Sequence, residues 1–266
     1  MDHDLRNKVA AISGGSRGIG LATARRLAEC GASIAFAARH SDNVARTEKE
    51  LAAIAARTEG AGVLGVAVDL TSAEGLESFV QQTTARFGGA DILVNSVGDS
   101  AYGPFLDLTD EMVVSSWTTK ALTALRLTRA FAPLMEQRGG GAIVNIGGGA
   151  GREPQYGGIP AALANASTRV LAKGIAAELA RRGIAVNSIS PGFVSTDRHR
   201  ERAELAARAR GVSAETILAE WDAATPTGRV TTPEEVAELV LFLVSRRVYN
   251  LTGAEIVLDG GMGRAV

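Results

Sequence analysis

Short apolar runs alternate with longer amphipathic stretches along the chain, and several of the runs end at a glycine, an asparagine or an aspartate. A short apolar run bounded in this way is typical of a strand buried on both faces, whereas a longer stretch with helical periodicity is typical of a helix. Strands are therefore expected at residues 9–12, 33–38, 63–68, 91–95, 141–146, 184–189 and 254–258.

The stretches between these runs predict helices at residues 21–28, 43–58, 73–87, 110–137, 161–181, 203–209 and 214–223. Thr232, Pro233 and the acids that follow predict the start of a last long helix. Regular alternation of strand and helix favours a parallel sheet with helices on both faces. The charged segment 196–227 interrupts this alternation and is interpreted as a substrate lid. No repeat or linker divides residues 1–266, so one α/β domain is expected.

Composition and charge narrow the function classes. A formal net charge of −1 provides no basic field, so no nucleic-acid partner is expected. No apolar run approaches the length of a membrane span and the first residues are polar, so we expect a cytoplasmic protein without a membrane partner. Cys30 is the single cysteine, which excludes a disulfide within the chain. His3 and His40 lack partner residues, so no metal site is predicted.

The glycine-rich segment 13–20 (SGGSRGIG) carries the clearest candidate chemistry. It lies between the first expected strand and the first expected helix, so helical N–H groups and the positive end of the helix dipole face one cleft. Gly14 allows a tight turn, Gly18 allows a pyrophosphate to approach the backbone, and Gly20 lets the helix pack closely on its strand. The segment therefore predicts a phosphate-binding loop.

Four further motifs extend this pattern over nearly the whole chain. The glycine-rich loop resembles a TGxxxGxG motif with Ser13 in place of threonine, and residues 95–98 (NSVG) resemble NNAG. Pro191-Gly192 with Thr196 matches a PG motif, and residues 252–261 match a C-terminal signature in two parts, TGA and DGG. In this order the motifs resemble those of the short-chain dehydrogenase/reductase family. The resemblance implies a Rossmann-like, doubly wound parallel sheet of seven strands and a homodimer or homotetramer.

The end of the second expected strand bears on the choice of cofactor. NAD-selective sites place an acid there for the ribose 2′-hydroxyl, whereas this chain has Arg39. Arg39 offers a bidentate partner for a 2′-phosphate, and Arg17 in the glycine-rich loop adds a second positive charge. NADP(H) is therefore favoured over NAD(H), with a small molecule as substrate.

The resemblance also implies cofactor contacts at other positions. Asp69 would contact the adenine, although capping the helix near Thr71 and Ser72 is an equal alternative. Asn95 would meet the adenosine ribose or hold the strand ends, and Thr196 would contact the nicotinamide carboxamide. The full set assigned to the cofactor is Gly14, Ser16, Arg17, Gly18, Ile19, Gly20, Arg39, Asp69, Leu70, Asn95, Val97, Gly98, Pro191, Gly192, Val194 and Thr196.

The catalytic positions depart from the family pattern. The family uses a serine after the fifth strand and a Tyr-x-x-x-Lys pair on the next helix. These three positions hold Gly148, Ala161 and Asn165 in this chain. No tyrosine is followed by a lysine four residues later, so the pair has not shifted along the chain. The usual proton donor is therefore absent.

The family's fourth catalytic position, an asparagine on the preceding helix, aligns with Lys120. Lysine and asparagine have thus exchanged helices, and the chain resembles a divergent branch of the family with this arrangement. Lys120 lies on the apolar stripe of its expected helix, which indicates an inward position rather than a solvated one. Tyr156 lies in the loop after the fifth strand, either at the active site or packed under the lid. Lys120, Asn165 and Tyr156 are the candidate catalytic residues.

Three mechanisms remain open from the sequence. In the preferred one, hydride passes between NADPH and a carbonyl or imine, and Lys120, Tyr156 or water supplies the proton. In the second, the cleft catalyses a non-redox dehydration, cyclisation or isomerisation, with Lys120 as a base or an imine-forming amine. In the third, the protein is a catalytically silent subunit that binds the cofactor.

Overall fold

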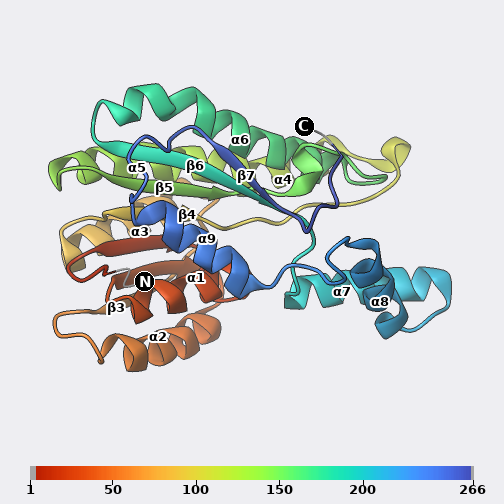
Figure 1. Cartoon of the computed structure of the whole chain (residues 1–266), viewed down its shortest axis with the longest axis horizontal. Helices are drawn as coiled ribbons and strands as arrows, with labels where there is room; N and C mark the ends of the chain where they lie inside the picture. The colour runs from red at the N-terminus through yellow and green to blue at the C-terminus, as the bar shows by residue number, and fades with distance from the viewer. Residues whose placement is uncertain (1–3, 265–266) are drawn as a thin grey trace.

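Seven parallel strands form one sheet in residues 4–264, the part of the chain that this computed structural model describes (Figure 1). Their order across the sheet is β3-β2-β1-β4-β5-β6-β7. The strands are β1 (Val9–Ser13), β2 (Ser33–Ala38), β3 (Val63–Ala67), β4 (Ile92–Asn95), β5 (Gly141–Ile146), β6 (Ile184–Pro191) and β7 (Glu255–Leu258). This order confirms the expected doubly wound, Rossmann-like α/β fold, and it reverses direction between β1 and β4.

Helices cover both faces of the sheet. The helices are α1 (Gly18–Glu29), α2 (Ser41–Ala55), α3 (Ala73–Phe87), α4 (Asp110–Trp117), α5 (Thr123–Gln137), α6 (Ile159–Ala180), α7 (Asp197–Arg210), α8 (Ala214–Ala224) and α9 (Pro233–Val244). Short helical turns lie at η1 (Phe105–Asp107), η2 (Thr118–Leu122) and η3 (Gly149–Gly151). Helices α1, α2 and α9 pack together on one face, while α3, α5 and α6 pack together on the other. None of the helices in the described residues is long and apolar enough to cross a membrane.

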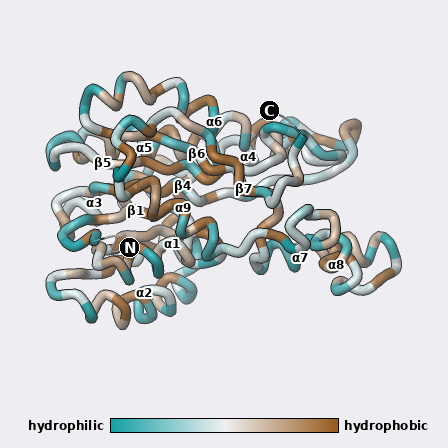
Figure 2. Tube along the Cα trace, viewed as in Figure 1, coloured by the Kyte–Doolittle hydropathy of each residue, from teal (hydrophilic) through white to brown (hydrophobic). Residues whose placement is uncertain are grey.

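Alternate residues of each central strand enter different cores. In β1, Ala10 and Ile12 join the core under α1 and α9, whereas Val9 and Ala11 join the core under α3 and α5. Both sides of such a strand are removed from water, which explains why the strands read as continuous apolar runs rather than alternating ones. Hydrophobic residues accordingly concentrate along the central strands in Figure 2.

The expected helix at 110–137 is wrong in one respect, because it is not a single α-helix. Its middle, η2, is a π-helical turn of five residues between α4 and α5. A π turn inserts an extra residue into the helical repeat, and such turns are frequent at functional sites. Lys120 lies at the centre of this turn.

The segment that interrupts the alternation forms two helices, α7 and α8, which project from the body of the molecule (Figure 1). Helix α7 begins six residues before the expected start at 203, because the side chain of Thr196 caps it by accepting a hydrogen bond from the His199 N–H. The two helices share a small core of Ala203, Ala207 and Ile217. The action of this segment as a substrate lid stays a prediction.

The expected start of the last helix is confirmed at α9. Thr232 Oγ1 accepts a hydrogen bond from the Glu235 N–H, and the Glu235 carboxylate accepts one from the Thr232 N–H. We expect Thr232→Ala to lower the free energy of unfolding by about 1 kcal/mol, because it leaves a helical N–H without its partner. Urea unfolding should show the lower midpoint. Thr232→Ser keeps the hydroxyl and should unfold like wild type, and an unchanged midpoint in Thr232→Ala would contradict the role of the cap.

Candidate active site

A cleft of about 700 Å³ opens at the carboxyl ends of the strands, next to the point where the strand order reverses. The glycine-rich loop, the ends of β2, β3 and β4, the turn η2, helix α6 and the start of α7 line it. Ligands of doubly wound sheets bind at this position, because neighbouring connections leave the sheet on opposite faces there.

Close backbone contacts fix the glycine-rich loop. Gly14 has φ +73°, in the left-handed region that favours glycine. A Cβ atom on Gly20 would lie 2.2 Å from the Gly14 carbonyl oxygen, so no larger residue fits there. Ser13 Oγ accepts hydrogen bonds from the N–H groups of Ser96 (3.0 Å) and Val97 (3.2 Å). The hydroxyl at this position therefore ties the glycine-rich loop to the loop after β4.

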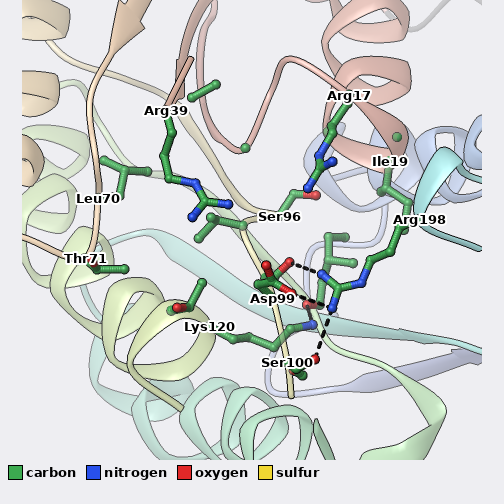
Figure 3. A pocket seen from close by; sticks show the side chains of 18 of the residues that line it. Arg17, Ile19, Arg39, Leu70, Thr71, Ser96, Asp99, Ser100, Lys120 and Arg198 are labelled. Atoms are coloured by element: carbon green, nitrogen blue, oxygen red, sulfur yellow. Dashed lines mark hydrogen bonds and ion pairs between the residues drawn. The ribbon is translucent and has the colours of Figure 1, made fainter. Parts of the chain in front are cut away.

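Two arginines face the same cleft from different elements (Figure 3). Arg17 precedes the first turn of α1, which contains no acid, and Arg39 follows the end of β2. Hydrogen bonds from Thr71 and, to a lesser degree, the positive charge of Arg39 lower the pKa of Asp69. The helix dipole and the two guanidinium groups make this half of the cleft suitable for phosphate groups.

The structure shows the contacts that Asp69 and Asn95 make within the chain. Ser72, not Asp69, caps α3, and Asp69 instead accepts hydrogen bonds from the N–H (2.9 Å) and hydroxyl (2.8 Å) of Thr71 while lining the cleft. The buried Asn95 lies outside the lining of the cleft and donates to Asn145 Oδ1 at 2.8 Å. It therefore holds the ends of β4 and β5 together.

Most other residues assigned to the cofactor also line the cleft, namely Gly14, Ser16, Gly18, Ile19, Gly20, Leu70, Val97, Gly98 and Thr196. Three do not. Pro191 ends β6, Gly192 packs against Asp259, and Val194 forms an isolated bridge with Thr231. These three shape the start of the lid rather than the wall of the cleft.

Lys120 lies at the floor of the cleft, where its ammonium group is held by backbone carbonyls. Nζ donates to the carbonyl oxygens of Ile146 (3.1 Å) and Gly147 (3.0 Å) at the end of β5. Burial, and secondarily the positive charge of Arg198, lower the pKa of Lys120 to about 8. The inward position expected from the sequence is thus present, and the amine is a much better proton donor than an exposed lysine.

Glycine makes this position of Lys120 sterically possible. A Cβ atom on Gly98 would lie 2.7 Å from Lys120 Cε, so a side chain there would require the lysine stem to shift. The last residue of the NSVG segment therefore packs directly against the lysine stem. Gly98 and Lys120 are a matched pair on two neighbouring elements.

Gly148 and Asn165, which the sequence comparison aligns with the family's serine and lysine, form a second matched pair. A Cβ atom on Gly148 would lie 3.0 Å from Asn165 Nδ2, so the asparagine takes the space that a serine side chain would need. Asn165 lines the cleft, and its buried Oδ1 has no hydrogen-bond partner. Ala161, one helical turn earlier on α6, also lines the cleft.

Tyr156 is not brought together with Lys120 and Asn165. It is 92% exposed and does not line the cleft. It sits in the loop between η3 and α6, which holds the ring in solvent rather than under the lid. Among residues 4–264 there is also no group of three His, Cys, Asp or Glu residues that could hold a metal ion.

The sequence analysis missed Arg198 and Asp99. Arg198 lies in the first turn of α7, forms an ion pair with Asp99 at 2.6 Å, and lines the cleft near Lys120 (Figure 3). The sequence pattern predicted a helix only from residue 203, so it did not indicate that Arg198 lies on a helix. The available signal was a helix-capping threonine, Thr196, directly before a charged run.

Comparison with known proteins agrees with this geometry. A family model described as enoyl-(acyl carrier protein) reductase matches residues 14–263. Dehydrogenase/reductase SDR family member 4 of Oryctolagus cuniculus is 33% identical over 97% of this chain and 94% of its own length. A 3-oxoacyl-[acyl-carrier-protein] reductase of Vibrio cholerae is 32% identical over 97% of this chain and 98% of its own.

Among solved structures, L-sorbose reductase from Gluconobacter frateurii, complexed with NADPH and L-sorbose, is 33% identical. It superposes with a TM-score of 0.94 and covers all of both chains. The family match, the relatives and the ordered motifs agree over nearly the whole length. The chain therefore belongs to the short-chain dehydrogenase/reductase family.

Proposed function

We propose that the protein is an NADP(H)-dependent oxidoreductase that reduces a carbonyl or imine of a small molecule, with Lys120 in the role of the missing tyrosine. One observation carries the proposal. An ammonium group of lowered pKa is held at the floor of the cleft, which Ala161 and Asn165 also line.

The cleft fits a dinucleotide with a 2′-phosphate. Gly18, at φ +53°, leaves the backbone without a side chain where a pyrophosphate would approach, and the start of α1 presents helical N–H groups. Arg39 and Arg17 would hold the 2′-phosphate, and Thr196 would hold the nicotinamide end. When bound, the cofactor supplies the hydride. The related L-sorbose reductase structure, which contains NADPH, supports this assignment.

Lys120 would act as the proton donor to the substrate oxygen or nitrogen. Its bonds to Ile146 and Gly147 use two of the three N–H groups and leave one for a ligand. A pKa of about 8 lies close to neutral pH, where a general acid is most effective. The same lowered pKa would also suit the imine-forming amine of the non-redox alternative, so the NADPH-consumption test below separates the two.

Asn165 would complete the site as a hydrogen-bonding group. Its side chain lines the cleft, and its unpartnered Oδ1, which is shielded from solvent, would accept a hydrogen bond from a hydroxyl of the cofactor ribose or of the substrate once a ligand rotates the amide. The polar groups of Lys120 and Asn165 in the cleft disfavour the alternative that the protein is a catalytically silent subunit. A homodimer or homotetramer and a cytoplasmic location stay predictions.

The first test concerns the 2′-phosphate. Arg39→Asp should weaken NADPH binding about tenfold to a hundredfold, because a charge-assisted contact is replaced by repulsion. NADH binding should hold or improve, since an acid at this position accepts a hydrogen bond from the ribose. Calorimetric titration with both nucleotides measures the ratio of the two dissociation constants.

Arg57→Asp is the matched control for Arg39→Asp. It makes the same change of charge at an exposed position outside the cleft, and it should leave the ratio unchanged. An unchanged ratio in Arg39→Asp would remove Arg39 from the phosphate site. Failure of wild type to bind either nucleotide would contradict the proposed function itself.

The second test concerns Lys120. Lys120→Ala should lower the rate of NADPH-dependent reduction by about 10²–10⁴-fold, the contribution of a general acid, while NADPH affinity is kept. In wild type the reduction rate should be level below pH 8 and fall above it, because only the protonated ammonium donates and its pKa is about 8. NADPH consumption over a panel of ketones, aldehydes and imines, followed against pH, provides both measurements.

Two control variants accompany Lys120→Ala. Lys173→Ala removes an exposed lysine of α6, and Tyr156→Phe removes the exposed hydroxyl outside the cleft; both should turn over like wild type. Full activity of Lys120→Ala would refute its role as proton donor. Loss of activity in Tyr156→Phe alone would transfer that role to Tyr156.

A further inference from the structure

Arg198 is a charged residue of the cleft to which the proposed reduction gives no role. It stands in the first turn of α7, where the helix dipole disfavours a cation. Its guanidinium nevertheless points back into the cleft, over the loop after β4 and close enough to lower the pKa of Lys120 (Figure 3). Two cations therefore stand close together in the half of the cleft away from Arg39.

Backbone carbonyls hold the guanidinium in place. Arg198 Nη1 donates to the Gly98 carbonyl oxygen at 3.0 Å, and Nη2 donates to the Ser100 carbonyl oxygen at 3.3 Å. One helical turn later on α7, Arg202 lies over the ring of Tyr102, with its guanidinium carbon 4.2 Å from the ring centre. The lid thus docks on the segment 98–102 through two arginines on one helix face.

The remaining partner of Arg198 is a carboxylate. Asp99 pairs with Nη2 at 2.6 Å and lines the same cleft. The Asp99 side chain is 54% exposed, against 31% for Arg198. Exposed ion pairs of this kind contribute little free energy, so Asp99 can leave at small cost while the two carbonyls keep Arg198 in position.

The other acids in this part of the cleft are committed elsewhere. Glu111 lies in the first turn of α4 and Asp197 in the first turn of α7, where helix dipoles stabilise them. Hydrogen bonds from its own N–H and from Thr109 also lower the pKa of Glu111. Asp99 is therefore the internal carboxylate that a ligand would have to replace.

From this arrangement we propose that Arg198 binds a carboxylate of the substrate, which displaces Asp99, so that the protein acts on oxo acids or their imines. The inference rests on the proposed reductase function for the carbonyl half of the substrate. The planar guanidinium can bind a substrate carboxylate in the same way in which it now binds the carboxylate of Asp99. Lys120 would then face the reacting group, and Arg198 would fix the end of the molecule that does not react.

The test compares acids with neutral isosteres. Calorimetric titration uses 2-oxopentanoate and 4-oxopentanoate, each beside its methyl ester, with NADP⁺ present. Wild type should bind the acids at least about tenfold more tightly than the esters, the effect of one charge-assisted contact. Arg198→Gln should remove this difference by weakening the acids alone. Asp99→Asn should strengthen acid binding, because the internal competitor is gone.

Arg208→Gln is the matched control, since Arg208 is exposed on the same helix and does not line the cleft. Equal binding of acid and ester by wild type, or a preference that survives Arg198→Gln, would overturn the inference. If Arg198→Gln also displaces helix α7, the Asp99→Asn variant still decides the question. Weaker binding of the acids by Asp99→Asn would also overturn the inference.

NADPH consumption with the same four compounds separates the two proposals. Reduction of esters and acids at equal kcat/KM would keep the reductase and reject the carboxylate site. Acid binding that depends on Arg198, without NADPH consumption by any carbonyl or imine of the wider panel, would keep the carboxylate site and reject the reductase.

Discussion

A buried ammonium group needs oxygen atoms in place of water, and the arrangement of the active site follows from how Lys120 obtains them. The carbonyls of Ile146 and Gly147 supply two acceptors where β5 ends. To reach them, the stem of Lys120 crosses the cleft directly against Gly98, where a side chain would force the stem to move. The π turn at η2 lies at the origin of that stem. Removing the charge from bulk water lowers the pKa of Lys120 to about 8, which makes the group chemically useful.

The exchange of residues between η2 and α6 is also a matter of space. A Cβ atom on Gly148 would lie 3.0 Å from Asn165 Nδ2, so a serine there would require the asparagine to shift by a few tenths of an ångström. Glycine at 148 and asparagine at 165 are therefore compatible in packing, as the proposed exchange of residues requires.

Charge divides the cleft into two parts. Arg17, Arg39 and the start of α1 face one part, where the proposed cofactor phosphates would bind. Lys120 and Arg198 face the other, and Asp99 neutralises Arg198 there. Like charges at close range raise the free energy of both groups, so an additional anion in this part would be stabilised. Helix α7 therefore contributes a positive charge to this part of the cleft, because Arg198 belongs to it.

The sequence by itself determined the elements whose signals are local. Apolar runs located all seven strands to within two residues, since a strand buried on both faces needs continuous apolar residues. The glycine-rich loop followed from backbone sterics, and the cap at Thr232 followed from one hydroxyl and one carboxylate nearby in the chain. The inward position of Lys120 was also legible, because helical periodicity reports which side of a helix faces the core.

Only the tertiary structure decided what depends on residues far apart in the chain. The partners of Lys120 lie on β5, and those of Arg198 lie some hundred positions earlier in the sequence. Asn95 had two readings, and the structure shows the contact of one of them, its pairing with Asn145. Tyr156 matches neither of its two readings, because its side chain is 92% exposed outside the cleft. The π turn stayed hidden because one inserted residue barely disturbs an apolar stripe. Local pattern thus determined the elements and the loop, and long-range packing determined the chemistry that they bring together.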